Sequence, residues 1–227
     1  MIKAVIFDMD GLMIDSEKMA RFCCEKAGKE LGYNYTDKLF FKEMGLTPVF
    51  IKELYFKHFG KDFKYDDFIK LKNQYVEEYI KESGIPVKPG LYELLKFLKN
   101  NGYKTAVATS TPRKRAEDYL THIKVIEFFD KVICGDMIEK SKPNPEIYLK
   151  AADELNVKTE ECFVLEDSPN GITAAYRAGI KTIMVPDLVS PDEELKKKLF
   201  ACVKSLKDVI EILEKYNNEY CLRRISH

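Results

Sequence analysis

A short apolar run that ends in two carboxylates constrains this chain more than any other feature. Residues Ala4–Phe7 follow one another without polar alternation, which predicts a strand covered on both faces, as in parallel sheets. Asp8 and Asp10 follow directly, and Gly11 comes next. Open α/β sheets bind their ligands beyond the carboxyl ends of the strands. We therefore expect both carboxylates at the mouth of a site, although Asp-Gly after a strand is also a common turn.

Three later strand-like runs also end in polar groups that suit a phosphate and a metal. The groups are Thr109, Ser110 and Thr111 after residues 104–108, Lys142 after residues 131–135, and Glu166 and Asp167 after residues 162–165. Each group has an ordinary alternative. Lys142 alone could be a solvated surface lysine, and Thr111-Pro112 and Ser168-Pro169 have the pattern of a helix N-cap followed by proline. The order of acid pair, hydroxyl, lysine and acid pair at successive strand ends is much harder to obtain by chance.

That order resembles the haloacid dehalogenase superfamily of phosphotransferases. The four motifs that carry the resemblance are Asp8-Met9-Asp10-Gly11, Thr109-Ser110, Lys142-Pro143 and Glu166-Asp167. Three longer stretches, residues 7–17, 142–148 and 165–171, are similar to the β-phosphoglucomutase and sugar- or nucleotide-phosphatase group, which has a helical cap. The resemblance extends from residue 1 to about residue 213 and is specific for the superfamily, but it says little about the substrate.

The chain alternates between two sequence patterns. Residues 16–84 contain no convincing strand, and their apolar residues recur at helical spacing in segments that end near Gly32, Gly60 and Gly84. From Val87 onward, strand-like and helix-like segments alternate, which predicts a parallel sheet with helices on both faces. We predict an α/β fold with a Rossmann-like parallel sheet core, residues 1–15 and 85–227, and an inserted α-helical cap domain, residues 16–84. The aromatic residues of the cap are expected to form its core.

Charge and composition exclude several classes of function. The chain has 37 basic and 37 acidic residues, so charge gives no argument for nucleic acid or an anionic membrane as a partner. No apolar stretch approaches the ~18 residues of a membrane span, and no secretory segment is visible. The six cysteines are scattered without a C-x-x-C pair, and the three histidines lack the spacing of a zinc site. We expect a cytoplasmic monomer with reduced cysteines.

The resemblance implies a role for each motif residue around a phosphoryl group. Asp8 would be the nucleophile and would form an aspartyl-phosphate intermediate. Asp10 would act as general acid and base, first for the leaving oxygen and then for the hydrolytic water. Thr109, the backbone amide of Ser110 and Lys142 would hold the transferred phosphoryl group.

The resemblance also implies a magnesium ion. Mg²⁺ prefers hard oxygen ligands and usually takes a few carboxylates together with the substrate phosphate. By resemblance, Asp8, the backbone carbonyl of Asp10 and Asp167 would bind it, and Glu166 would bind it directly or through water. The implied activity is hydrolysis of a small phosphorylated metabolite, which could be a sugar, polyol or nucleoside phosphate.

Two alternatives from other classes fit less well. A dehalogenase of the same superfamily lacks an acid at the second aspartate position, so Asp10, Glu166 and Asp167 argue against that activity. A non-enzymatic phospho-receiver also combines acids, a hydroxyl and a lysine at strand ends. Receivers, however, have about half this length and no cap insert, and they place the phosphorylated aspartate after a later strand.

A sugar phosphomutase of the β-phosphoglucomutase type is the main alternative within the family. Its pattern has a histidine shortly after the first motif and an arginine in the cap turn. Here the corresponding neighbourhoods read Lys18-Met19-Ala20 and Leu46-Thr47-Pro48-Val49, with neither residue. The sequence therefore favours a phosphatase over a mutase. Candidate substrate contacts in the cap are Ser16–Lys18 and the turn at Gly45–Thr47.

Overall fold

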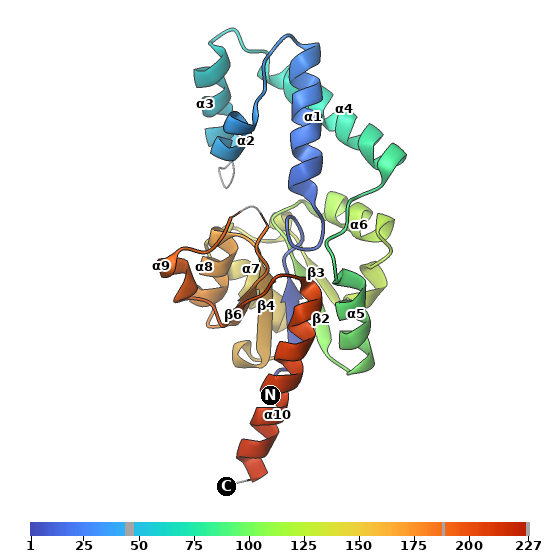
Figure 1. The fold of residues 1–227 in the computed structure, drawn as a ribbon, viewed down its shortest axis with the longest axis vertical. Coiled ribbons are helices and arrows are strands. Elements are labelled where there is room, and N and C mark those ends of the chain that lie inside the picture. The colour runs from blue at the N-terminus through green and yellow to red at the C-terminus, as the bar shows by residue number, and fades with distance from the viewer. Residues whose placement is uncertain (44–47, 188, 226–227) are drawn as a thin grey trace. The chain divides into compact units, whose positions relative to one another are not determined.

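The computed structural model describes residues 1–43, 48–187 and 189–225, which form two compact units (Figure 1). The core unit comprises Met1–Ile14 and Val87–His227, and the cap unit comprises Asp15–Pro86. The chain passes between them at Ile14–Asp15 and at Pro86–Val87. The sequence placed these two junctions after residue 15 and after residue 84.

The core unit contains a six-stranded parallel sheet with strand order β3-β2-β1-β4-β5-β6. Its strands are β1 (Ala4–Phe7), β2 (Lys104–Ala108), β3 (Lys131–Ile133), β4 (Cys162–Glu166), β5 (Lys181–Met184) and β6 (Ala201–Cys202). Its α-helices are α5 (Leu91–Asn100), α6 (Arg113–His122), α7 (Glu146–Glu154), α8 (Pro169–Arg177), α9 (Glu193–Lys196) and α10 (Val209–Ile225). Short 3-10 helices lie at Ile126–Phe128, Gly135–Met137, Thr159–Glu161 and Leu206–Asp208. The predicted α/β core with a parallel sheet is confirmed.

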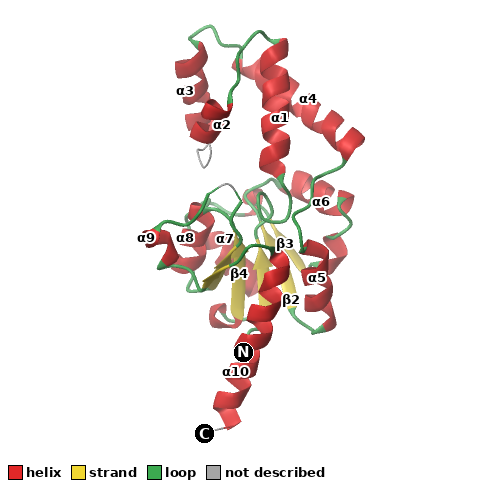
Figure 2. Cartoon of the chain, in the orientation of Figure 1, coloured by secondary structure: helices red, strands yellow, loops and turns green. Residues whose placement is uncertain are grey.

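Helices cover both faces of the sheet, which explains why the central strands lack polar alternation (Figure 2). On one face, Ala4 and Ile6 of β1 belong to the same buried cluster as Ile147 of α7 and Ala174 of α8. On the other face, Phe163 of β4 packs against the rings of Phe200 and of Tyr216 in α10.

The order of the strands determines where a ligand can bind. From β1 the chain continues to β2 and β3 on one side, and β4, β5 and β6 lie on the other side. Strands β1 and β4 are therefore neighbours at the point where the order reverses, with Phe7 opposite Leu165. In α/β sheets, this reversal opens a crevice beyond the carboxyl ends of the two strands. The residues that follow β1 and β4, Asp8 and Asp167, lie at this place.

The described residues of the cap unit form four helices, α1 (Ser16–Glu30), α2 (Asp37–Glu43), α3 (Pro48–Phe59) and α4 (Tyr65–Ser83), and α1 packs along α4. Its aromatic residues form the core of the unit, as predicted, because Tyr35, Tyr55, Phe63 and Phe68 are all buried and their rings contact one another. The predicted substrate turn at Gly45–Thr47 lies outside the described residues.

Within the described ranges, no helix is long and apolar enough to cross a membrane.

Candidate active site

Three carboxylates meet where β1 and β4 end. Asp8 follows β1, and its backbone amide donates to the carbonyl oxygen of Leu165 at 3.0 Å. Glu166 is the last residue of β4, and Asp167 follows it. Asp8, Glu166 and Asp167 each offer a carboxylate oxygen, and these atoms lie within 4.8 Å of one another. The parallel pairing of two strands therefore builds an acidic centre from residues about 160 positions apart.

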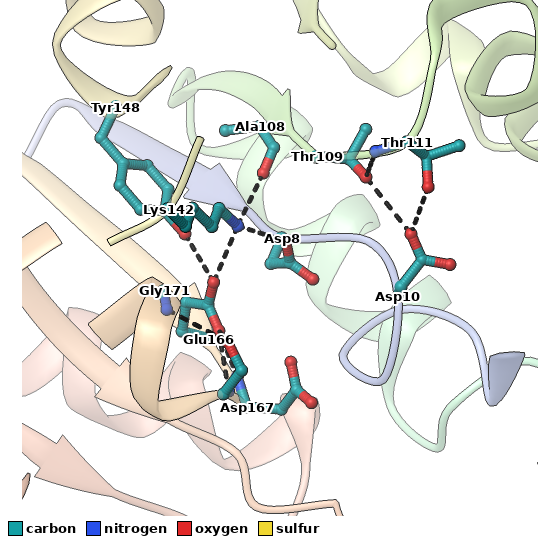
Figure 3. A network of polar contacts seen from close by, with 11 residues as sticks. Asp8, Asp10, Ala108, Thr109, Thr111, Lys142, Tyr148, Glu166, Asp167 and Gly171 are labelled. Carbon is teal, nitrogen blue, oxygen red and sulfur yellow. Dashed lines mark hydrogen bonds and ion pairs between the residues drawn. The ribbon is translucent and has the colours of Figure 1, made fainter. Parts of the chain in front are cut away.

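Lys142 is the positive charge of this centre (Figure 3). Its Nζ donates to Oδ1 of Asp8 at 2.5 Å, to Oε1 of Glu166 at 2.8 Å and to the carbonyl oxygen of Ala108 at 3.1 Å. The side chain is only 7% exposed, so the alternative of a solvated surface lysine does not hold. Burial alone would lower the pKa of Lys142, but the charges of Asp8 and Glu166 outweigh it and keep the pKa above its usual value.

The carboxylate of Glu166 is fully buried and accepts five hydrogen bonds. Oε1 accepts from Lys142 and, at 2.7 Å, from the hydroxyl of Tyr148. Oε2 accepts from the backbone amides of Asp167 and Ser168 and from the Ser168 hydroxyl. Burial would raise the pKa of Glu166, but Lys142 and these donors lower it, so Glu166 holds its charge. Because an ionised carboxylate offers about four lone-pair sites, Glu166 has little capacity left for another partner.

Two glycines make room for the carboxylates. A Cβ atom at Gly171, in the first turn of α8, would overlap the carboxylate of Glu166. A Cβ atom at Gly11 would overlap the carboxylate of Asp167, and Gly11 also has a φ of +83°, which favours glycine. The acidic centre thus depends on two positions that exclude any side chain.

Asp167 has the free coordination capacity that Glu166 lacks. Its Oδ1 is buried without a hydrogen-bond partner. Burial is the largest cause that raises the pKa of Asp8 to about 8 and the pKa of Asp167 to about 9, and the neighbouring carboxylates add to it. Three carboxylates share one ammonium group here, so the site is short of positive charge. A divalent cation would supply that charge and a partner for Oδ1, and all-oxygen donors suit a hard ion.

Asp10 lies apart from this cluster. Its carboxylate contacts the hydroxyl motif that follows β2. Its Oδ2 accepts hydrogen bonds from Oγ1 of Thr111 at 2.7 Å and from Oγ1 of Thr109 at 3.3 Å. Thr109 is fully buried. The structure therefore connects the first and second motifs directly through side chains (Figure 3).

The alternative of a helix N-cap holds for only one of the two motifs. Ser168 is an N-cap, because its hydroxyl accepts from the amide of Gly171 and Pro169 begins α8. Thr111 is not, because α6 begins only at Arg113 and Pro112 occupies the cap position without a side-chain bond. The hydroxyl of Thr111 instead donates to Asp10. In the same Thr/Ser-Pro pattern, the hydroxyl caps a helix in one motif and donates to a carboxylate in the other.

Ser110, which is predicted to bind the phosphate together with Thr109 and Lys142, lies between Thr109 and Thr111 and is exposed. Its carbonyl oxygen lies so close to Gly135 that a Cβ atom there would overlap it, and the amide of Gly135 donates to the carbonyl oxygen of Thr111 at 3.2 Å. Gly135 thus lets the loop after β3 pack against the backbone of the second motif.

Tyr148 and Gly171 also belong to the site, although the sequence alone does not reveal their roles; they are the last residues of the stretches 142–148 and 165–171. Tyr148 lies among apolar residues at helical spacing, and a buried tyrosine in such a stripe needs a partner for its hydroxyl. Gly171 lies three residues after the N-cap, in the first turn of a helix. Glycine destabilises a helix at this position, so its presence indicates that a neighbouring group needs the space. These two features were the available signals, but neither one identifies Glu166 as the partner.

Comparison with known proteins agrees with this geometry. The sequence profile of the haloacid dehalogenase-like hydrolase family matches residues 5–185. The phosphorylated carbohydrates phosphatase of Thermotoga maritima is 35% identical over 187 residues, which cover 80% of this chain and 84% of the relative.

Solved structures share the fold along almost the whole chain. The β-phosphoglucomutase of Clostridium difficile is 26% identical with a TM-score of 0.74, over 98% of this chain and 100% of that chain. A variant of CbbY from Rhodobacter sphaeroides, in complex with xylulose-(1,5)bisphosphate, is 27% identical with a TM-score of 0.75, over 91% of this chain and 96% of that chain. The chain described here belongs to the haloacid dehalogenase-like hydrolase family and is a phosphatase-type hydrolase with a helical cap.

Proposed function

We propose that this protein is a Mg²⁺-dependent phosphatase that hydrolyses small phosphorylated sugars through an aspartyl-phosphate on Asp8. The observation that carries the proposal is the position of Lys142, which is buried and bonded to Asp8 beside the unpartnered oxygen of Asp167. A phosphoester resists attack because its anionic oxygens repel the nucleophile. A carboxylate with an ammonium group and a cation site next to it has what this attack requires.

In the first step, a carboxylate oxygen of Asp8 attacks phosphorus and the bond between phosphorus and the sugar oxygen breaks. Lys142 holds Oδ1 of Asp8, and the other carboxylate oxygen has no partner among the residues drawn in Figure 3. That second oxygen is the one available for attack. Asp10 gives its proton to the departing sugar oxygen, which leaves as the alcohol.

In the second step, water attacks the phosphorus of the aspartyl-phosphate and Asp10 accepts a proton from it. The bond between phosphorus and the Asp8 oxygen breaks, which releases inorganic phosphate and restores the carboxylate. The hydroxyl of Thr109, the amide of Ser110 and Lys142 are proposed to hold the phosphoryl group in both steps. The hydrogen bonds of Thr109 and Thr111 to Asp10 support a shared site for the acid–base residue and this hydroxyl motif.

The residues present fit a magnesium ion. Asp8 and Asp167 are the proposed direct ligands, together with the backbone carbonyl of Asp10, because Asp167 has a buried oxygen without a partner. Glu166 is proposed to act indirectly, by holding Lys142 in place, since its oxygens already accept five hydrogen bonds. When bound, the ion supplies positive charge that offsets the repulsion between Asp8 and the phosphoryl oxygens.

The substrate class is proposed from the relatives. The Thermotoga maritima relative is described as a phosphatase of phosphorylated carbohydrates, and the CbbY structure contains a sugar bisphosphate. The similar β-phosphoglucomutase keeps a mutase as the second candidate. The side chains of Lys18 and Val49, near the positions of the mutase histidine and arginine, are both exposed, and Val49 cannot bind a second phosphate.

A substrate panel tests the proposal. Phosphorylated sugars, polyols and nucleoside monophosphates are incubated with Mg²⁺, and release of inorganic phosphate is measured. We expect phosphate from several sugar phosphates. The mutase is tested with β-glucose 1-phosphate and a trace of the bisphosphate, where glucose 6-phosphate forming faster than free phosphate would contradict the phosphatase assignment.

A further inference from the structure

Two buried side-chain atoms in the described part of the chain have no hydrogen-bond partner, Oδ1 of Asp167 and Oδ2 of Asp187. Buried acceptors are almost always paired in folded proteins, so each such atom calls for a missing donor or cation. Asp167 is assigned to the metal site above. Asp187 belongs to none of the four motifs.

Asp187 lies at the same end of the sheet as the acidic centre. Strand β5 pairs with β4 so that Met184 lies opposite Glu166, and the amide of Val185 donates to the carbonyl oxygen of Glu166 at 2.9 Å. The chain from Val185 to Asp187 therefore leaves the sheet beside Asp167.

Lys88 fixes the carboxylate of Asp187. Its Nζ donates to Oδ1 of Asp187 at 2.5 Å, and the two side chains are 19% and 12% exposed. The backbone amide of Lys88 in turn donates to the carbonyl oxygen of Met13, in the turn that follows Asp10. Oδ1 of Asp187 is thus held from a segment next to the first motif, and its second carboxylate oxygen, Oδ2, has no donor in the described part of the chain.

We propose that Asp187 is a positioning residue for the metal ion: Oδ2 accepts a hydrogen bond from a water molecule in the coordination shell of the ion, and Lys88 orients the carboxylate for it. The inference rests on the proposed function, since it needs a cation at Asp8 and Asp167. One such water would satisfy Oδ2 of Asp187 while the ion satisfies Oδ1 of Asp167. Carboxylates of this kind orient the ligands of many metal sites and affect affinity strongly.

The test is Mg²⁺ binding to the full-length protein without substrate, measured by isothermal titration calorimetry. The decisive variant combines Lys88→Gln with Asp187→Asn. It removes one positive and one negative charge, so the net charge near the site stays the same and no lysine is left unpaired. We expect its Mg²⁺ dissociation constant to rise about tenfold. Asp187→Asn alone should show a loss of the same order, and at saturating Mg²⁺ both variants should recover most of the wild-type turnover.

The control is Glu154→Gln, which breaks the ion pair of Glu154 with Lys131 between α7 and β3. It should leave Mg²⁺ affinity unchanged, and thermal unfolding in chelator should show that all variants fold. If the double variant binds Mg²⁺ within about twofold of the wild type, Lys88 and Asp187 form only a structural ion pair and the inference is wrong. A wild-type protein that binds no Mg²⁺ and releases no phosphate would overturn the proposed function, and this inference with it.

Discussion

Among single residues, Glu166 is the clearest example of how hydrogen bonds stabilise the acidic centre. It is fully buried and ionised, and its five donors come from the loop after β3, from α7 and from the start of α8. A buried carboxylate without donors would cost several kcal/mol, so each of these donors has a measurable effect on stability. Substitutions at Tyr148 and Gly171 test the surroundings of Glu166, because each can be made with a change of only a few atoms.

Tyr148→Phe removes one hydroxyl and keeps the ring against Lys142. We expect the free energy of unfolding to fall by about 1.5–3 kcal/mol, because the lost hydrogen bond goes to a charged, buried acceptor. Urea unfolding with EDTA present measures this. The matched control is Tyr176→Phe at an exposed position of α8, with an expected change within about 0.5 kcal/mol. Equal stability of the two variants would show that the hydroxyl of Tyr148 does not hold Glu166.

Gly171→Ala adds one methyl group where the carboxylate of Glu166 lies. Glu166 or α8 must shift, so phosphate release should fall by more than about tenfold, with a stability loss of about 1–3 kcal/mol. Gly32→Ala is the control, because its Cβ would enter open space and only its φ of +78° is strained. It should lose about 1–2 kcal/mol and keep its activity. Wild-type activity in Gly171→Ala would contradict the assigned role of this glycine.

Strands β1 and β4 bring three carboxylates around one lysine. Burial and, after it, the neighbouring negative charges raise the pKa of Asp8 to about 8 and that of Asp167 to about 9 in the metal-free protein. Both values exceed the value of about 3.9 for an unfolded chain. The contribution of these two groups to stability is therefore complete below pH 4 and is lost as the pH rises through 8 and 9.

Mg²⁺ binds the ionised carboxylates and so competes with their protons. We therefore expect the stabilisation by Mg²⁺ to grow as the pH rises from 6 to 9, because fewer protons must leave. The measurement is the midpoint of thermal unfolding with EDTA and with a fixed Mg²⁺ concentration, at each pH. The difference between the two midpoints should widen with pH. A difference that stays constant over this range would show that the two carboxyls are already ionised at pH 6.

For the molecule as a whole, the sequence is sufficient to predict the architecture. The apolar runs and the helical periodicity predicted the parallel sheet and the helical insert, because strands buried on both faces and amphipathic helices leave different patterns. The site motifs were also visible, since β1 and β4 end in acids. The hydrogen-bond partners of the site side chains could not be predicted. Nothing local in the sequence shows that Thr111 donates to Asp10 or that Tyr148 donates to Glu166, because these contacts join segments 101 and 18 residues apart.

Asp187 shows the same limit. It comes shortly after the apolar residues of β5, where an aspartate is ordinary. Only the pairing of β5 with β4 and the hydrogen bond from Lys88 place it beside the acidic centre with one oxygen unpartnered.

In the proposed mechanism, Asp8 carries the phosphoryl group. The most direct test compares phosphate release by the wild type and by Asp8→Asn, with the same sugar phosphate and saturating Mg²⁺. Circular dichroism and thermal unfolding serve to confirm that the variant is folded. Because a neutral amide attacks poorly, we predict a loss of more than about a thousandfold in turnover. A folded Asp8→Asn protein that releases phosphate within about tenfold of the wild-type rate would show that Asp8 is not the nucleophile.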